Sequence, residues 1–170
     1  LAKAGFSRED ILVLVGDLVE KGRDSLATLR YIMELSATHT VYALCGNCDN
    51  LAVDFIYGNG ELGRDFYRFY LSVWGERALI LQMAAEAGME VRGPGDLPGL
   101  RMLLLERFRS ELEFLRSLPT ILESEHLVFV HGGVPSYAHM EELDAWQCMK
   151  NDDFLGQGRV FPKSVSYTHL

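Results

Sequence analysis

Residues 40–50 read TVYALCGNCDN, in which an apolar run typical of a buried strand stops abruptly at Gly46. We expect the strand to cover residues 40–47. Asn47, Cys48 and Asp49 then follow at its carboxyl end. An amide, a thiol and a carboxylate in three successive positions suggest a functional site. The spacing Cys45-x-x-Cys48 is that of a redox pair or of half a zinc site, and a site that uses the amide and the carboxylate is the third alternative.

The segment before this stretch completes a strand–helix–strand unit. ILVLVGD, at 11–17, is a second apolar run that ends in a polar residue, and residues 25–36 carry apolar side chains at helical spacing. Such a crossover predicts a parallel pair of strands. A third run, HLVFVHGGV at 126–134, predicts another strand. The sequence therefore predicts an α/β fold, with a parallel-to-mixed sheet and flanking helices.

Residues 51–118 have a different character, and we expect a helical insertion there. Within RMLLLERFRSELEFLRSL, at 101–118, four apolar residues recur at helical spacing. They predict one amphipathic helix with a core-facing stripe: Leu104, Phe108, Leu112 and Leu115.

Composition narrows the class of protein. The formal net charge is −8 and the sequence pI is about 5.1, which argues against a general nucleic-acid binder. No apolar run reaches the roughly 18 residues of a membrane span, and no basic-then-apolar leader is present. Three cysteines do not make a disulfide framework. We therefore expect a cytoplasmic protein that binds neither nucleic acid nor membrane.

Three predicted strands end in polar side chains, Asp17, Asn47 and His131. In open α/β sheets, ligands bind outside the carboxyl ends of the strands, so these side chains are expected to meet in one crevice. Carboxylate, amide oxygen and imidazole all bind divalent metals. The pattern predicts a metal site made by these three residues.

GDLVEKG (16–22), GNCD (46–49) and FVHGG (129–133) together resemble the calcineurin-like metallophosphoesterases. The nearest branch is that of the serine/threonine protein phosphatases and diadenosine-tetraphosphatase-like enzymes, which reads GD-x-x-D-R-G, then G-N-H-E or G-N-H-D, then H-A/G-G. The resemblance covers about residues 5–163. It implies a partial metallophosphoesterase sandwich with the helical insertion at about 51–118, in a domain that we place at 1–163.

The resemblance also implies roles for the three polar tips. In that family the aspartate matching Asp17 bridges two metals, and the residues matching Asn47 and His131 bind the second. The metals are usually manganese, iron or zinc. Two metals about 3.5–4 Å apart can clamp a phosphate and hold a hydroxide that attacks phosphorus. The implied function is metal-dependent hydrolysis of phosphate monoesters or phosphoanhydrides, with a phosphorylated protein, nucleotide or small molecule as substrate.

Two residues depart from the family pattern inside its motifs. Lys21 stands where the family has an arginine that grips the substrate phosphate, and it keeps the charge but loses the bidentate fork. Cys48 replaces the histidine that protonates the leaving group, although Asp49 matches the acid that orients it. A thiol is a poor match for that proton donor. We therefore expect substrates with good leaving groups, such as phosphoanhydrides and aryl phosphates.

Two of the family's ligand blocks do not occur in these 170 residues, namely the first D-x-H and the final G-H. We expect the first to lie upstream of Leu1, and the second to fall where SVSYTHL now stands. Residues 164–170 are therefore interpreted as a non-native tail on a truncated domain. Since the first metal loses its main ligands, we expect this chain to be inactive.

Two alternatives to a phosphatase stay open. The loss of the histidine and arginine would also suit a non-catalytic binding or regulatory module that keeps the metallophosphatase fold. The C-x-x-C spacing would suit a thiol oxidoreductase, although Asp49 opposes thiolate formation. We expect Cys45 to be a buried strand residue and Cys48 to line the active site.

Overall fold

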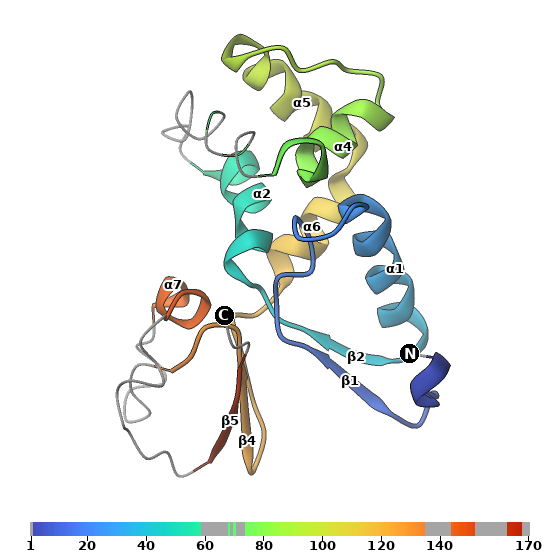
Figure 1. Cartoon of the computed structure of the whole chain (residues 1–170), viewed down its shortest axis with the longest axis vertical. Helices are drawn as coiled ribbons and strands as arrows, with labels where there is room; N and C mark the ends of the chain where they lie inside the picture. Colours follow the sequence, from blue (N-terminus) through green and yellow to red (C-terminus); the bar gives the residue numbers. More distant parts are fainter. Residues whose placement is uncertain are drawn as a thin grey trace. The chain divides into compact units, whose positions relative to one another are not determined.

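The computed structural model describes residues 2–58, 68, 70, 74–134, 144–151 and 163–167 (Figure 1). The described residues fall into two compact units. Unit 1 comprises Leu1–Asp17, Leu35–Asn47 and Leu118–Leu170, and unit 2 comprises Leu18–Glu34 and Cys48–Ser117. Each unit is described below by itself.

Unit 1 contains the strand pair that the sequence predicts. Strands β1 (Ile11–Leu14) and β2 (Thr40–Ala43) pair in parallel, with Leu12 opposite Val41 (Figure 1). The ladder continues one step further, because Leu44 donates its N–H to the carbonyl of Leu14 at 2.8 Å. Helix α1 (Ser25–Thr38), of which residues 25–34 belong to unit 2, connects the two strands along the chain. The parallel strand–helix–strand unit is therefore confirmed.

A second sheet in unit 1 carries the third predicted strand. Strand β4 (Leu127–Val130) lies between β3 (Ile121–Glu123), with which it is antiparallel, and β5 (Ser164–Ser166), with which it is parallel. Together with the parallel pair, this mixed sheet confirms the predicted α/β class. Neither β3 nor β5 is predicted from the sequence, since each is only three residues long.

The core of this second sheet forms from alternate residues of β4 and from the short helix α7 (Ala145–Met149). Val128 and Val130 are fully buried, whereas Leu127 is 40% exposed. Such alternation is expected where only one face of a strand packs on a core. The buried cluster and the side chains packed against it are Val128, Val130, Val134, Cys148, Ile121, Val165 and Tyr167.

Unit 2 is helical in its described part. After α2 (Asn47–Tyr57) come the 3-10 turn η2 (Gly75–Arg77), helix α4 (Leu79–Glu86), the turn η3 (Pro94–Asp96), and helices α5 (Leu97–Arg107) and α6 (Arg109–Ser117). Helix α5 contacts both α4 and α6. The helical character predicted for 51–118 agrees with these elements, but the boundaries of an insertion stay a prediction.

The single helix predicted for 101–118 is wrong, because the run divides into α5 and α6 at Phe108. That residue leaves helical geometry, with φ −123° and ψ 30°. It still donates its N–H to Leu104 and accepts the N–H of Leu112, so the two helices continue almost without a gap. The predicted apolar stripe is buried at all four positions. No glycine or proline marks the break in the sequence.

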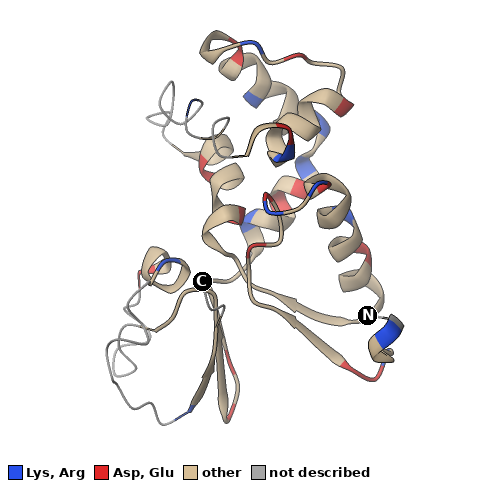
Figure 2. Ribbon diagram, in the orientation of Figure 1, with Lys and Arg blue, Asp and Glu red and all other residues tan. Residues whose placement is uncertain are grey.

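Charge is distributed unevenly over these elements. Strands β1, β2, β4 and β5 carry no Asp, Glu, Lys or Arg (Figure 2). Within the described residues, every helix is too short or too polar to cross a membrane. Residues 164–166 form β5, and the interpretation of 164–170 as non-native stays a prediction.

Candidate active site

The end of β1 makes an unusual turn that presents Asp17. Gly16 has φ 86° and Asp17 has φ 54°, so two successive residues adopt the left-handed conformation. This conformation is uncommon for residues other than glycine, and strain of this kind is concentrated at functional sites. A Cβ at Gly16 would lie 2.7 Å from both Gly46 N and His131 Nδ1, so only glycine fits.

The end of β2 packs directly against this turn. A Cβ at Gly46 would lie 2.4 Å from Asp17 N and 3.1 Å from His131 Cε1. The glycine therefore allows the two strand ends and the imidazole to approach each other closely. Asn47 follows at once as the first residue of α2 and is half-buried.

His131 follows β4 and is fully buried. Its Nδ1 lies 2.7 Å from the carbonyl oxygen of Val15. A carbonyl can only accept, so Nδ1 carries the proton and donates it. Its Nε2 lies 3.3 Å from Asp17 Oδ1 and finds no hydrogen-bond partner in the described part of the chain. The structure thus brings the side chains of Asp17 and His131 together, with the backbone before Asn47 beside them.

The loop after Asp17 is held by Asp49 within unit 2. Asp49 is fully buried in the first turn of α2, and its Oδ1 accepts the N–H groups of Leu18 at 2.8 Å and Val19 at 3.1 Å. The carboxylate therefore anchors the loop backbone. A further role in orienting a proton donor stays a prediction.

The other predicted residues of unit 2 differ in exposure. Lys21 is exposed, and its Nζ lies 5.7 Å from the ring centroid of Trp74, within the range of a cation–π contact. Cys48 is 2% exposed. The role of Cys48 in lining an active site stays a prediction, and its side chain is buried.

The cysteines do not form a disulfide. The thiols of Cys45, Cys48 and Cys148 are all buried. The Sγ atom of Cys45 contacts the carbonyl oxygen of Gly46 at 3.5 Å. Cys45 is 5% exposed, as predicted for a small buried residue, but it lies beyond the strand, because β2 ends at Ala43.

Comparison with known families accounts for the spacing of these motifs. The model of the calcineurin-like phosphoesterases matches residues 2–163, nearly the whole chain. The chain belongs to the calcineurin-like phosphoesterase family. A comparison with curated proteins gave no match. The serine/threonine phosphatase or diadenosine-tetraphosphatase-like branch stays a prediction.

Calcineurin-like phosphoesterases normally bind divalent metals, and the surroundings of His131 fit such an ion. A metal-binding histidine commonly donates its second ring N–H to a backbone carbonyl, as Nδ1 does to Val15. Its Nε2 then faces Asp17 Oδ1 at 3.3 Å, and a cation held between these two atoms would be bound by both. Within the described ranges, no three His, Cys, Asp or Glu side chains group as a metal site. The predicted ligand set is not a group of this kind, because it contains only one Asp and one His, and its third ligand is the amide of Asn47.

Glu20 and Tyr70 are the two residues that sequence reasoning missed. Glu20 is fully buried with φ 73°, and its Oε1 accepts a hydrogen bond from the hydroxyl of Tyr70. The family pattern GD-x-x-D-R-G places an acid at this position, which is the signal that could have identified Glu20. Tyr70 lies in a helical segment with no motif, so nothing in the sequence singles it out.

Proposed function

We propose that this calcineurin-like phosphoesterase hydrolyses phosphate monoesters or phosphoanhydrides with the help of two divalent metal ions, manganese, iron or zinc. The observation that carries the proposal is the buried His131 Nε2, 3.3 Å from Asp17 Oδ1 and without a hydrogen-bond partner in the described residues. An imidazole nitrogen and a carboxylate oxygen that face each other in a buried place are both suitable ligands for a divalent cation.

Asp17, Asn47 and His131 would hold the metal. When bound, such ions supply a nucleophile at neutral pH and neutralise charge on the phosphoryl oxygens. The chain's own residues prepare the site. Val15 fixes the imidazole tautomer, while Gly16 and Gly46 permit the close approach of the strand ends.

Lys21 would contact the substrate phosphate through its ammonium group. Cys48 and Asp49 would stand on the leaving-group side, where the thiol is a weak proton donor at neutral pH. The enzyme should therefore favour substrates whose leaving oxygen needs little protonation, such as aryl phosphates and nucleotide anhydrides. A protein phosphoserine, with its alkoxide leaving group, should be a poorer substrate.

Metal binding by the chain itself is the first test. Since the D-x-H and G-H blocks do not occur in these 170 residues, titration with Mn²⁺, Fe²⁺ and Zn²⁺ should show only one of the two proposed sites. His131→Ala should weaken this site by about 10-fold to 100-fold, the usual cost of disturbing a metal's protein shell. His126→Ala is the matched control, because that side chain is 82% exposed. Equal binding by the wild type and His131→Ala would contradict the proposal.

Catalysis is tested separately. The D-x-H and G-H blocks do not occur in these 170 residues, so we expect little turnover from them, and the complete product of the source gene is the better enzyme for the assay. It should release phosphate from aryl phosphates faster than from alkyl phosphates, and only with metal. Metal binding without any turnover by the complete product would instead favour the non-catalytic binding module.

A further inference from the structure

Glu20 is a buried carboxylate for which the proposed mechanism has no use. It is fully buried, although it lies between Val19 and the exposed Lys21 in a loop. Its backbone φ of 73° is unfavourable for any residue other than glycine. A buried acid in a strained backbone conformation is costly, so contacts elsewhere must hold it in place.

The carboxylate of Glu20 is held by two groups that lie far along the chain. The hydroxyl of Tyr70 donates to Oε1, and the N–H of Leu79 lies 3.2 Å from each carboxylate oxygen. Leu79 is the first residue of α4, and the preceding Ala78 offers no side-chain cap. Glu20 therefore caps α4 from a distant loop, where a negative charge is favoured by the helix dipole.

The backbone of the same loop is fixed residue by residue. Leu18 and Val19 donate to Asp49, and Glu20 donates its N–H to Ser25 Oγ at 2.9 Å. Lys21 donates its N–H to the carbonyl of Val19 at 3.0 Å. Four successive N–H groups thus have defined acceptors, and the Glu20 side chain ties the loop to α4.

Tyr70, which binds Glu20, also contacts Trp74, whose ring lies beside Lys21. Trp74 donates its N–H to the carbonyl of Tyr70 at 2.9 Å, and its ring lies 5.7 Å from Lys21 Nζ. Tyr70 therefore connects to Glu20 through its hydroxyl and to Trp74 through its backbone. The Tyr70 hydroxyl thus contacts Glu20, and the Trp74 ring contacts Lys21, the next residue of the same loop.

We infer that Glu20 is a positioning residue for Lys21: the contacts of its carboxylate with Tyr70 and Leu79 hold the loop so that the Lys21 ammonium stands beside Trp74, ready for a phosphate. The inference rests on the proposed function, in which Lys21 contacts the substrate phosphate. Glu20 itself would touch neither substrate nor metal.

The test is a double-mutant cycle that uses inorganic phosphate as the probe. Its Kd for the Mn²⁺-loaded chain is measured by calorimetry. Glu20→Ala should weaken phosphate about tenfold, the value of one charge-assisted hydrogen bond. In a Lys21→Met background the same change should alter the Kd less than twofold, since the side chain it positions is gone. Equal weakening in both backgrounds would overturn the inference.

Rescue separates positioning from general damage. Glu20→Gln keeps an oxygen that can accept from Tyr70 and Leu79, so it should restore most of the affinity that Glu20→Ala loses. If Glu20→Ala does not fold, Tyr70→Phe replaces it, because this change removes one hydrogen bond and keeps the ring. Glu90→Gln, at a side chain that is 74% exposed, is the control and should have no effect.

The outcomes also distinguish the two proposals. If Lys21→Met weakens phosphate while the Glu20 and Tyr70 variants do not, the proposed function stands and the inference about Glu20 fails. If wild-type protein binds no phosphate with Mn²⁺, Fe²⁺ or Zn²⁺, the proposed function fails and the inference fails with it.

Discussion

At the scale of single residues, Glu20 should give the protein a measurable pH dependence. Burial raises the pKa of its carboxyl from 4.5 to about 7, although hydrogen bonds from Tyr70 and Leu79 oppose the shift. The folded state then holds the proton more tightly than the unfolded state. The contribution of Glu20 to stability is therefore greatest below about pH 4.5 and is lost as the pH rises through about 7, by roughly 3 kcal/mol in total.

Glu20→Gln tests this dependence because the amide does not titrate. The free energy of unfolding, measured with urea between pH 5 and pH 8, should fall more steeply with pH for the wild type than for the variant. The difference between the two proteins should level off above about pH 7, where the wild-type carboxyl is already ionised. Parallel curves for the two proteins would show that Glu20 keeps an ordinary pKa.

Residues also differ in how well the sequence reveals them. Asp17, Asn47 and His131 follow apolar runs directly, so a simple pattern locates them, and the structure brings Asp17 and His131 within 3.3 Å. Tyr70 could not be predicted in this way. Its importance comes from a contact with Glu20, 50 positions away, and such contacts are set by the packing of helices rather than by local sequence.

At the scale of secondary-structure elements, the approach of β1 and β2 at their carboxyl ends depends on Gly46. Gly46→Ala would place a Cβ 2.4 Å from Asp17 N, so the backbone must shift. We expect a loss of about 1–3 kcal/mol in the free energy of unfolding, as for overpacked cores. Mn²⁺ affinity should fall as well, because Asp17 is displaced.

Gly22→Ala is the matched control for this substitution. It lies in the loop after β1, and a Cβ there would meet nothing within 4 Å. The change should leave stability unaltered or raise it by about 0.4–1 kcal/mol, through the reduced entropy of the unfolded chain. Urea unfolding and Mn²⁺ titration on both variants decide the matter. Equal effects of the two substitutions would mean that close approach at Gly46 is unimportant.

Elements with strong periodicity were predictable, and short ones were not. The strand–helix–strand unit of β1, α1 and β2 follows from long apolar runs at distinct spacings. β3 and β5 have only three residues each, too few for a period to appear, and they exist because β4 offers both edges for pairing. The break at Phe108 lacks glycine or proline, so only tertiary packing reveals it.

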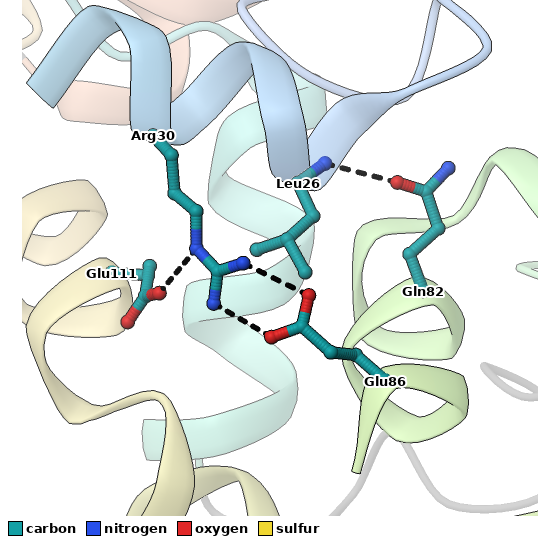
Figure 3. A network of polar contacts seen from close by, with 5 residues as sticks. All are labelled: Leu26, Arg30, Gln82, Glu86 and Glu111. Carbon is teal, nitrogen blue, oxygen red and sulfur yellow. Dashed lines mark hydrogen bonds and ion pairs between the residues drawn. The ribbon is translucent and has the colours of Figure 1, made fainter. Parts of the chain in front are cut away.

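At the scale of the whole molecule, the described chain divides into two compact units. Unit 1 carries the strand ends with Asp17 and His131. In unit 2, Arg30 of α1 joins two other helices (Figure 3): its guanidinium contacts Glu86 of α4 at 2.8 and 2.9 Å and Glu111 of α6 at 2.9 Å. Gln82 of α4 adds a contact to the N–H of Leu26 at 2.9 Å. One side chain of α1 thus helps to hold the helices of unit 2 together.

Arg30→Met should therefore loosen unit 2 selectively. The change leaves Glu111, whose side chain is only 11% exposed, without its cation, and an unpaired charge of this kind costs about 2 kcal/mol. Arg92→Met is the matched control. It removes an ion pair with Glu90 whose side chains are 77% and 74% exposed, so it should cost less than about 0.5 kcal/mol.

Hydrogen exchange can assign that loss to one unit. In Arg30→Met, amides of α4, α5 and α6 should exchange faster, while those of β1, β2 and β4 keep their wild-type rates, because the helices lose a shared partner and the strands do not. Mn²⁺ bound at Asp17 and His131 should do the reverse, slowing exchange in the strands of unit 1. Uniform acceleration in both units would mean that the chain opens as one cooperative body, and the division into two units would then have no energetic meaning.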